Sequence, residues 1–228
     1  MNDNHDTTSI ILIFLIFIFL IWMIQDKIKN KKWFIEGMSD GIHKKIILMG
    51  DGFLNNHNYV EPPDDIKTVM TKQKALVVAY KKSTIKDLES QLLSIPEKHN
   101  HAGTMIFISA GGMDLINNYR YGSETDLTKF NKILNEYKNV VKKIKKKFNH
   151  VQIILCDLSS VKLKGSENMF KRWNNQIYQF AKDHKFRVMK ISELFRNEDY
   201  IVKKLDPSKK GGDKIVSAIE NGEHEIPL

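Results

Sequence analysis

The stretch KIILMGDGFLNN, residues Lys45–Asn56, joins an apolar run to a turn rich in glycine, carboxylate and amide groups. Its first part, Lys45–Met49, is aliphatic and lacks polar alternation, as expected of a strand buried on both faces of a parallel sheet. Four similar runs follow along the chain, at Ala75–Tyr80, Thr104–Ser109, Val151–Cys156 and Arg187–Ile191. The sequence therefore predicts five buried strands.

Helical patterns separate these strands. Apolar residues recur at helical spacing through Leu127–Lys147, and Thr84 followed three residues later by Asp87 is a capping signal for a helix at Ser83–Leu93. Two more helices are predicted at Phe170–His184 and Gly212–Glu220. This alternation favours one α/β domain, residues 44–220, in which helices cover both faces of a parallel sheet.

An uncharged and almost wholly apolar segment, Thr7–Ile24, follows a short N-terminal tail of residues 1–6. A helix of about 18 residues extends about 27 Å, just enough to cross the hydrocarbon core of a bilayer. The alternative is a cleaved signal peptide, which would begin with basic residues and end at a pair of small ones. Asp3 and Asp6 precede the segment instead. We therefore predict a single transmembrane helix that anchors the chain in a lipid bilayer.

The charges around this segment predict its orientation. Residues 25–43 form a basic juxtamembrane linker, in which Lys27, Lys29 and two more lysines follow the span directly. By the positive-inside rule, the α/β domain then lies on the cytoplasmic side of the membrane. Residues 221–228 form a C-terminal tail.

The overall composition argues against several functional classes. The net charge is +9, but nearly all basic residues are lysine and no basic stripe interleaves with aromatic residues, so we expect no nucleic-acid binding. Cys156 is the single cysteine, so the chain forms no internal disulfide. His99 and His101 lack further ligands at an informative spacing, and we expect neither a metal nor a cofactor.

Three loops combine glycine with polar side chains where predicted strands or helices meet. They are Met49–Asn56 after the first strand, Ser109–Leu115 after the third, and Leu205–Gly212 before the last helix. In a parallel sheet, ligands bind at the carboxyl ends of the strands, and glycine lets the backbone approach a ligand closely. One such loop would be an ordinary tight turn, whereas three at one edge indicate a present or former active site.

Four segments together resemble the SGNH/GDSL hydrolases, a family of serine esterases and lipases. They are IILMGDGFLNN, AYKKSTIKDLESQL, MIFISAGGMDLI and LDPSKKGGDKIV, and they occur in this order between about Lys44 and Ile219. The usual motifs of that family are Gly-Asp-Ser after the first strand, a glycine after the second, Gly-x-Asn-Asp after the third, and Asp-x-x-His before the last helix. The resemblance implies a three-layer α/β/α sandwich with a flavodoxin-like sheet.

The catalytic positions of that family are substituted here. The resemblance places Gly52 at the nucleophilic serine, Lys82 near the oxyanion-binding glycine, Met113 at the oxyanion-binding asparagine, Asp206 at the histidine base and Lys203 at the aspartate that orients it. Glycine has no oxygen to acylate, methionine donates no hydrogen bond, and an aspartate of ordinary pKa is a weak base at pH 7. The usual serine-esterase mechanism is therefore not expected.

Two hypotheses from different classes follow. The preferred one is a membrane-anchored pseudoenzyme whose former active-site cleft binds a ligand or a partner, or only maintains the fold. The predicted cleft comprises Asp51, Gly52, Asn55, Lys82, Gly112, Met113, Asp114 and Asp206. In it, Lys82 and Asp206 are predicted to meet as an ion pair. The alternative is an active ester or acetyl hydrolase that uses an activated water or a displaced serine, for which Ser83 beside Lys82 is the candidate. A role for Ser83 at the start of the following helix is the simpler interpretation.

Overall fold

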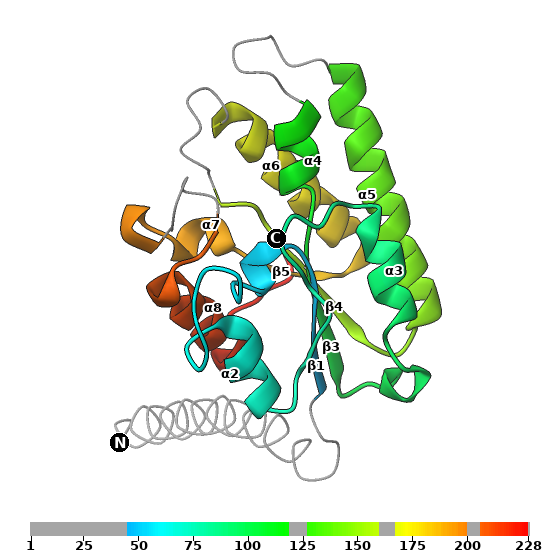
Figure 1. Ribbon diagram of the computed structural model, residues 1–228. Helices are drawn as coiled ribbons and strands as arrows, with labels where there is room; N and C mark the ends of the chain where they lie inside the picture. The colour runs from blue at the N-terminus through cyan, green and yellow to red at the C-terminus, as the bar shows by residue number, and fades with distance from the viewer. Residues whose placement is uncertain (1–44, 119–126, 160–166, 200–205, 228) are drawn as a thin grey trace, which may run out of the picture. The chain divides into compact units, whose positions relative to one another are not determined.

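The computed structural model describes residues 45–118, 127–159, 167–199 and 206–227 (Figure 1). Five strands form one sheet: β1 (Lys45–Gly50), β2 (Leu76–Val77), β3 (Thr104–Ser109), β4 (Gln152–Cys156) and β5 (Arg187–Met189). Their order is β2-β1-β3-β4-β5 and every neighbouring pair is parallel. This is the strand order of flavodoxin-like folds, so the predicted five-stranded parallel sheet is confirmed.

Helices cover both faces of the sheet. One face packs against α3 (Asp87–Leu93), α5 (Leu127–Lys147) and α6 (Glu167–His184). The other packs against α2 (Ile66–Lys72), α7 (Ile191–Leu194) and α8 (Lys209–Asn221). The short helix α4 (Gly112–Asn118) follows β3, and three 3-10 turns lie at Gly52–Leu54, Glu97–His99 and Asn197–Asp199. The domain is a three-layer α/β/α sandwich.

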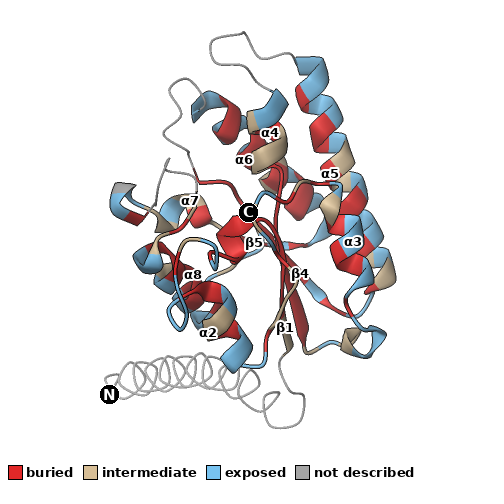
Figure 2. Cartoon of the chain, in the orientation of Figure 1, coloured by how far each residue is buried: buried red, intermediate tan, exposed pale blue. Residues whose placement is uncertain are grey.

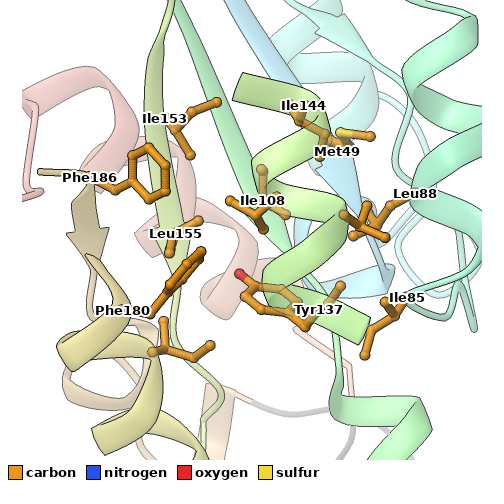
Figure 3. Packing of buried hydrophobic residues seen from close by; sticks show 14 of the residues in the cluster. Met49, Ile85, Leu88, Ile108, Tyr137, Ile144, Ile153, Leu155, Phe180 and Phe186 are labelled. Carbon is orange, nitrogen blue, oxygen red and sulfur yellow. The ribbon is translucent and has the colours of Figure 1, made fainter. Parts of the chain in front are cut away.

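Alternate residues of each central strand enter the two cores, which explains why these strands show no polar alternation. In β3, Ile106 and Ile108 face the α3/α5/α6 layer, whereas Met105 and Phe107 face the α2/α7/α8 layer. Figure 2 shows the sheet and the inward sides of the helices as buried. In the close view of Figure 3, Tyr137 of α5 lies beside the sheet residues of the core under α3, α5 and α6.

Several boundaries differ from those predicted. The edge strand β2 pairs regularly at only two residues rather than over Ala75–Tyr80. The amides of Val78 and Ala79 both bond to the carbonyl of Leu48, which interrupts the regular pairing, and the amide of Tyr80 still bonds to the carbonyl of Gly50. The helix predicted at Ser83–Leu93 begins at Asp87, since the Asp87 carboxylate accepts from the amide of Thr84 at 2.7 Å and closes a turn before it. The helices α2, α4 and α7 were not predicted, because seven residues or fewer show no helical periodicity; α3 is equally short and was predicted only from the capping signal of Thr84 and Asp87.

The predicted membrane segment Thr7–Ile24, the linker 25–43 and Lys203 lie outside the described residues. Within the four described ranges, no helix has the length and apolar character that a membrane span requires.

Candidate functional site

A cavity of about 370 Å³ lies at the carboxyl ends of the strands, next to the point where the strand order reverses between β1 and β3. Its lining comes from the loops after β1 to β4, from α4, α6 and the segment before α8. The lining residues are Asp51, Gly52, Phe53, Tyr59, Lys81, Lys82, Gly112, Met113, Ile116, Leu158, Ser159, Phe170 and Asp206. The three loops singled out in the sequence therefore do meet at one edge of the sheet.

The turn after β1 is fixed by its own backbone and by one buried amide. Gly50 has a φ of +120°, a conformation that favours glycine. The Gln91 side chain accepts from the Gly50 amide at 2.6 Å and donates to the Gly50 carbonyl at 3.0 Å. The next amide, that of Asp51, donates to the carbonyl of Ser109 at the end of β3, at 2.9 Å. These bonds hold residues 51–53 at the floor of the cavity.

Asp51 is 5% exposed, and its two carboxylate oxygens have different surroundings. Oδ1 accepts from the amide of Phe53 at 3.1 Å and from the hydroxyl of Ser109 at 2.8 Å. Among the described residues, none donates a hydrogen bond to Oδ2. Burial raises the pKa of Asp51 to about 7, since the nearby charges of Asp206 and Asp114 add to the effect and the two hydrogen bonds only partly offset it.

Asp206 occupies the space beside Gly52. A β-carbon built on Gly52 would lie 2.5 Å from Oδ1 of Asp206, so the carboxylate stands where a side chain at position 52 would begin. Asn56, fully buried, positions this segment because its amide donates to the carbonyl of Pro207 at 3.3 Å and accepts from the amide of Ile66 at 2.7 Å. Burial raises the pKa of Asp206, while Tyr59 and the charges of two lysines counteract this shift.

Those lysines are Lys81 and Lys82, which follow β2. The ammonium of Lys81 lies 4.0 Å from the centre of the Tyr59 ring, a cation–π contact, and Lys82 is exposed. Both lower the pKa of Asp206 through space. Among the ion pairs of the described residues, none joins Lys82 to Asp206, so the pair predicted from the sequence is not formed.

Lys82 has a left-handed backbone, with a φ of +60°. Only glycine adopts this conformation at little steric cost, and the resemblance places Lys82 near a glycine of the family. The sequence alone gave no sign that a lysine there would retain a glycine-like conformation.

We expect Lys82→Gly to raise the free energy of unfolding by about 0.5–1 kcal/mol, because relief of the left-handed strain exceeds the added backbone entropy of glycine in the unfolded chain. Urea denaturation measures this change. Lys82→Ala removes the same side chain but keeps the strain, and should change stability by less than about 0.5 kcal/mol. Equal stabilisation by both variants would contradict the explanation.

Two residues of the predicted cleft do not line the cavity. Asn55 is buried, and its amide donates to the carbonyl of Ala79 at 2.6 Å. Asp114 accepts from the amide of Ile85 at 3.0 Å, which ties the start of α4 to the loop after β2, and burial raises its pKa. Their contacts support the walls of the cavity rather than its interior.

The alternative nucleophile Ser83 also lies away from the cavity. It is fully buried, and its hydroxyl oxygen accepts from Nε2 of Gln91 at 2.9 Å. Ser109 is equally buried and donates to Asp51. Burial raises the pKa of the Cys156 thiol well above its ordinary value. Within the described ranges, no cluster of three potential metal ligands occurs.

Several residues that line the cavity were not predicted from the sequence. Tyr59 lies in an irregular loop, and no spacing rule links it to the strand ends. Leu158 and Ser159 follow β4, so the rule that ligands bind at strand ends would have found them. Phe170 was predicted only as the first residue of a helix, and its position beside the cavity depends on how α6 packs.

No protein-family model matches this sequence, and neither does any curated protein. Solved structures resemble it in fold. A GDSL-like lipase from Bacteroides thetaiotaomicron is 13% identical with a TM-score of 0.60, over 78% of this chain and 87% of that one. TesA is 9% identical with a TM-score of 0.60, over 78% and 96%. A catalytic mutant of an acetylxylan esterase from Geobacillus stearothermophilus is 15% identical with a TM-score of 0.56, over 79% and 94%.

These likenesses cover nearly all of each solved chain and the greater part of this one. The described part of this chain has the fold of the SGNH/GDSL hydrolases.

Proposed function

We propose that this protein is a catalytically inactive member of the SGNH/GDSL fold, anchored in a membrane, whose cleft binds a small ligand. The observation that carries the proposal is the geometry at Gly52, where a carboxylate oxygen of Asp206 lies 2.5 Å from the place of a β-carbon. Neither residue supplies a hydroxyl or thiol for attack on an ester. Acyl transfer through an enzyme nucleophile therefore has no atom to carry the acyl group at this position.

Other residues of the cavity also support the proposal that the protein is catalytically inactive. Met113 lines it at the start of α4 and offers no donor for a developing oxyanion. The loss of one such donor typically costs about 10²–10³ in rate. The resemblance places an imidazole at the position of Asp206, and an ionised carboxylate there has no proton to pass to a leaving group. The cavity itself is retained, with a volume in the range that suits a small ligand.

The membrane anchor rests on sequence. The apolar segment Thr7–Ile24 is long enough to cross a bilayer, and the lysines that follow it favour a cytoplasmic location of the domain. The partner of this segment is the lipid bilayer, and the cleft would then operate near a membrane surface.

An esterase assay tests the inactivity. The purified protein is expected to hydrolyse p-nitrophenyl acetate no faster than buffer and to show no adduct by mass spectrometry after treatment with a fluorophosphonate. An active serine esterase, treated in parallel, verifies both reagents. A stoichiometric fluorophosphonate adduct on any serine would overturn the proposal.

A second candidate has one observation in its favour. Asp51 lines the cavity with an oxygen that accepts no hydrogen bond from the described residues, and its pKa of about 7 suits a general base at neutral pH. It could deprotonate a water that attacks an ester directly. In the same assay, this function requires turnover without a serine adduct, a rate that rises as the pH passes 7, and loss of that rate in Asp51→Asn.

A further inference from the structure

Two carboxylates flank Gly52 at the floor of the cavity. Asp51 reaches it from the end of β1, and its Oδ2 lies 3.9 Å from the place of a β-carbon on Gly112, another lining residue. Asp206 reaches it from the segment before α8 and lies beside Gly52. The pair is close enough for the charge of Asp206 to raise the pKa of Asp51.

One hydrogen-bond acceptor at the floor of the cavity, an oxygen of Asp51, has no donor among the described residues. The side chain is nine-tenths buried, its Oδ1 is saturated by two donors, and its Oδ2 lacks a donor from the described residues. The enclosed side-chain atoms without a partner are Asp65 Oδ2, Trp173 Nε1 and Asp199 Oδ1 among the described residues, so Asp51 Oδ2 keeps accessible surface through which a donor can reach it. Here the open direction is the cavity, and a ligand donor placed there would complete the hydrogen bonding.

The positive charges of the cavity do not fill this role. Lys81 rests on the Tyr59 ring, and Lys82 is exposed to solvent. Among the described residues, no ion pair involves Asp51 or Asp206. Both acids therefore lack a cation at contact distance. Asp206 has the hydroxyl of Tyr59 as a hydrogen-bond partner, and its charge acts on Asp51 through space, so a cation between the two acids would be stabilised by both charges.

The remaining walls are apolar and confine the size of a ligand. Phe53, Met113, Ile116, Leu158 and Phe170 supply most of them. The cavity holds about 370 Å³, which is near the lower end for small-molecule sites. A ligand would thus meet charge at one end and hydrocarbon around its body.

We propose that the cleft binds a small molecule that carries a primary ammonium group on an apolar body, with the ammonium donating to Asp51 and Asp206. This inference rests on the proposed function of the cleft as a binding site. An ammonium has three donors, so it can bond to both carboxylates at once, and its charge replaces the missing cation. Its apolar body packs against the side chains of Met113, Leu158 and Phe170.

Three probes of the same carbon skeleton test the charge preference by titration calorimetry at pH 8: hexylammonium, hexanol and hexanoate. Hexylammonium is expected to bind the full-length protein at least about tenfold more tightly than hexanol, and hexanoate more weakly still. Equal binding of hexylammonium and hexanol, or tighter binding of hexanoate to the lysines, would overturn the inference. An absence of any hexylammonium binding would also overturn it.

Variants then locate the site. Asp51→Asn and Asp206→Asn are each expected to weaken hexylammonium binding at least about tenfold, because each removes one charge of the pair. Asp213→Asn, an exposed aspartate on α8, is the matched control and should bind as the parent does. Unchanged binding in both cavity variants would place the amine elsewhere and contradict the site.

The pH dependence supplies a second signature. The probe stays protonated from pH 5 to 9, so only groups of the protein titrate, and Asp51 must release its proton to accept the ammonium. Affinity is therefore expected to rise between pH 6 and 8 in the parent and to lose most of this rise in Asp51→Asn. The other titratable groups that interact with Asp51 are Asp206, Asp114, Tyr137 and Cys156, with Lys81 and Lys82 near Asp206.

The esterase assay is independent of these measurements. Turnover of p-nitrophenyl acetate with normal amine selectivity would refute the inactivity alone. An inactive protein that binds hexanol and hexylammonium equally would refute the amine preference alone.

Discussion

Gly50→Ala is expected to lower the free energy of unfolding by about 4 kcal/mol or more, or to abolish cooperative folding. A β-carbon on Gly50 would lie 1.8 Å from the carbonyl oxygen of Ser109, and its φ of +120° is unfavourable for any other residue. The obstacle is the backbone of β3, which pairs with β1 along its whole length, so it cannot move aside without breaking the sheet. Urea denaturation followed by circular dichroism measures the change.

Gly222→Ala provides the matched control. Gly222 also has a positive φ, +69°, but a β-carbon there would have nothing within 4 Å. It ends α8 in the left-handed conformation that helix termini favour, so its substitution should cost only about 1 kcal/mol. Nearly equal losses in the two variants would show that backbone strain alone matters and that the close approach of β3 does not.

The sequence predicted the fold well because burial on both faces leaves a continuous apolar signature. The runs that became β1, β3 and β4 lie in the middle of the sheet, and their predicted bounds agree with the structure to within a residue. The length of the edge strand β2 was overestimated, because the point where its pairing with β1 becomes irregular, at the carbonyl of Leu48, leaves no trace in the sequence. A long amphipathic helix such as α5 shows its periodicity in the sequence, whereas α2 and α4 are too short for that. The equally short α3 was predicted from its capping signal instead.

Part of the candidate site was also predicted, in this case from the topology of parallel α/β sheets rather than from apolar patterns. Gly52, Met113 and Asp206 follow strands or precede a helix in a parallel α/β pattern, so they had to share one edge of the sheet, and the structure places all three on the cavity. The spacing of residues in the sequence does not predict where their side chains point. The predicted ion pair of Lys82 and Asp206 is not formed, since Lys82 is exposed and its left-handed backbone could not be read from the sequence.

Positioning groups were the least predictable part of the site. Nothing in the sequence distinguishes Gln91 from other helix residues, but its buried side-chain amide bonds to both the N–H and the carbonyl of Gly50. Asn56 bridges two segments separated by more than a hundred residues in the sequence. Such contacts arise only from the tertiary fold, and no local pattern signals them.

Asp51→Asn is expected to stabilise the ligand-free protein at pH 8 by about 2–4 kcal/mol. A rise from the ordinary aspartate pKa to a pKa of about 7 means that the ionised carboxyl lowers the free energy of unfolding by about 4 kcal/mol. Asparagine has the same shape, and its carbonyl oxygen can accept from Phe53 and Ser109 as Oδ1 does. Its amide nitrogen would face the cavity in place of Oδ2, so the buried charge is removed without loss of these bonds.

The sign of the pH dependence follows from proton binding. The pKa of Asp51 is raised on folding, so between about pH 4 and 7 the folded protein holds a proton that the unfolded chain has released. The stability contribution of Asp51 therefore falls as the pH rises through this interval, and the full cost is present above pH 7. The advantage of Asp51→Asn should vanish near pH 4, whereas Asp213→Asn should differ little from the parent at either pH.

A gain in stability together with a loss of amine binding would show that Asp51 is retained for its charge at the expense of the fold. Functional residues often stand in this relation to stability, because a group that is poised to bind a ligand is unsatisfied without it. A ligand that binds Asp51 should reduce the stability difference between the two proteins. At pH 8 with saturating hexylammonium, the parent should gain stability by mass action, and Asp51→Asn should gain far less. If Asp51→Asn is instead less stable than the parent at pH 8, the carboxylate is a structural acceptor, and the unpartnered oxygen carries no binding role.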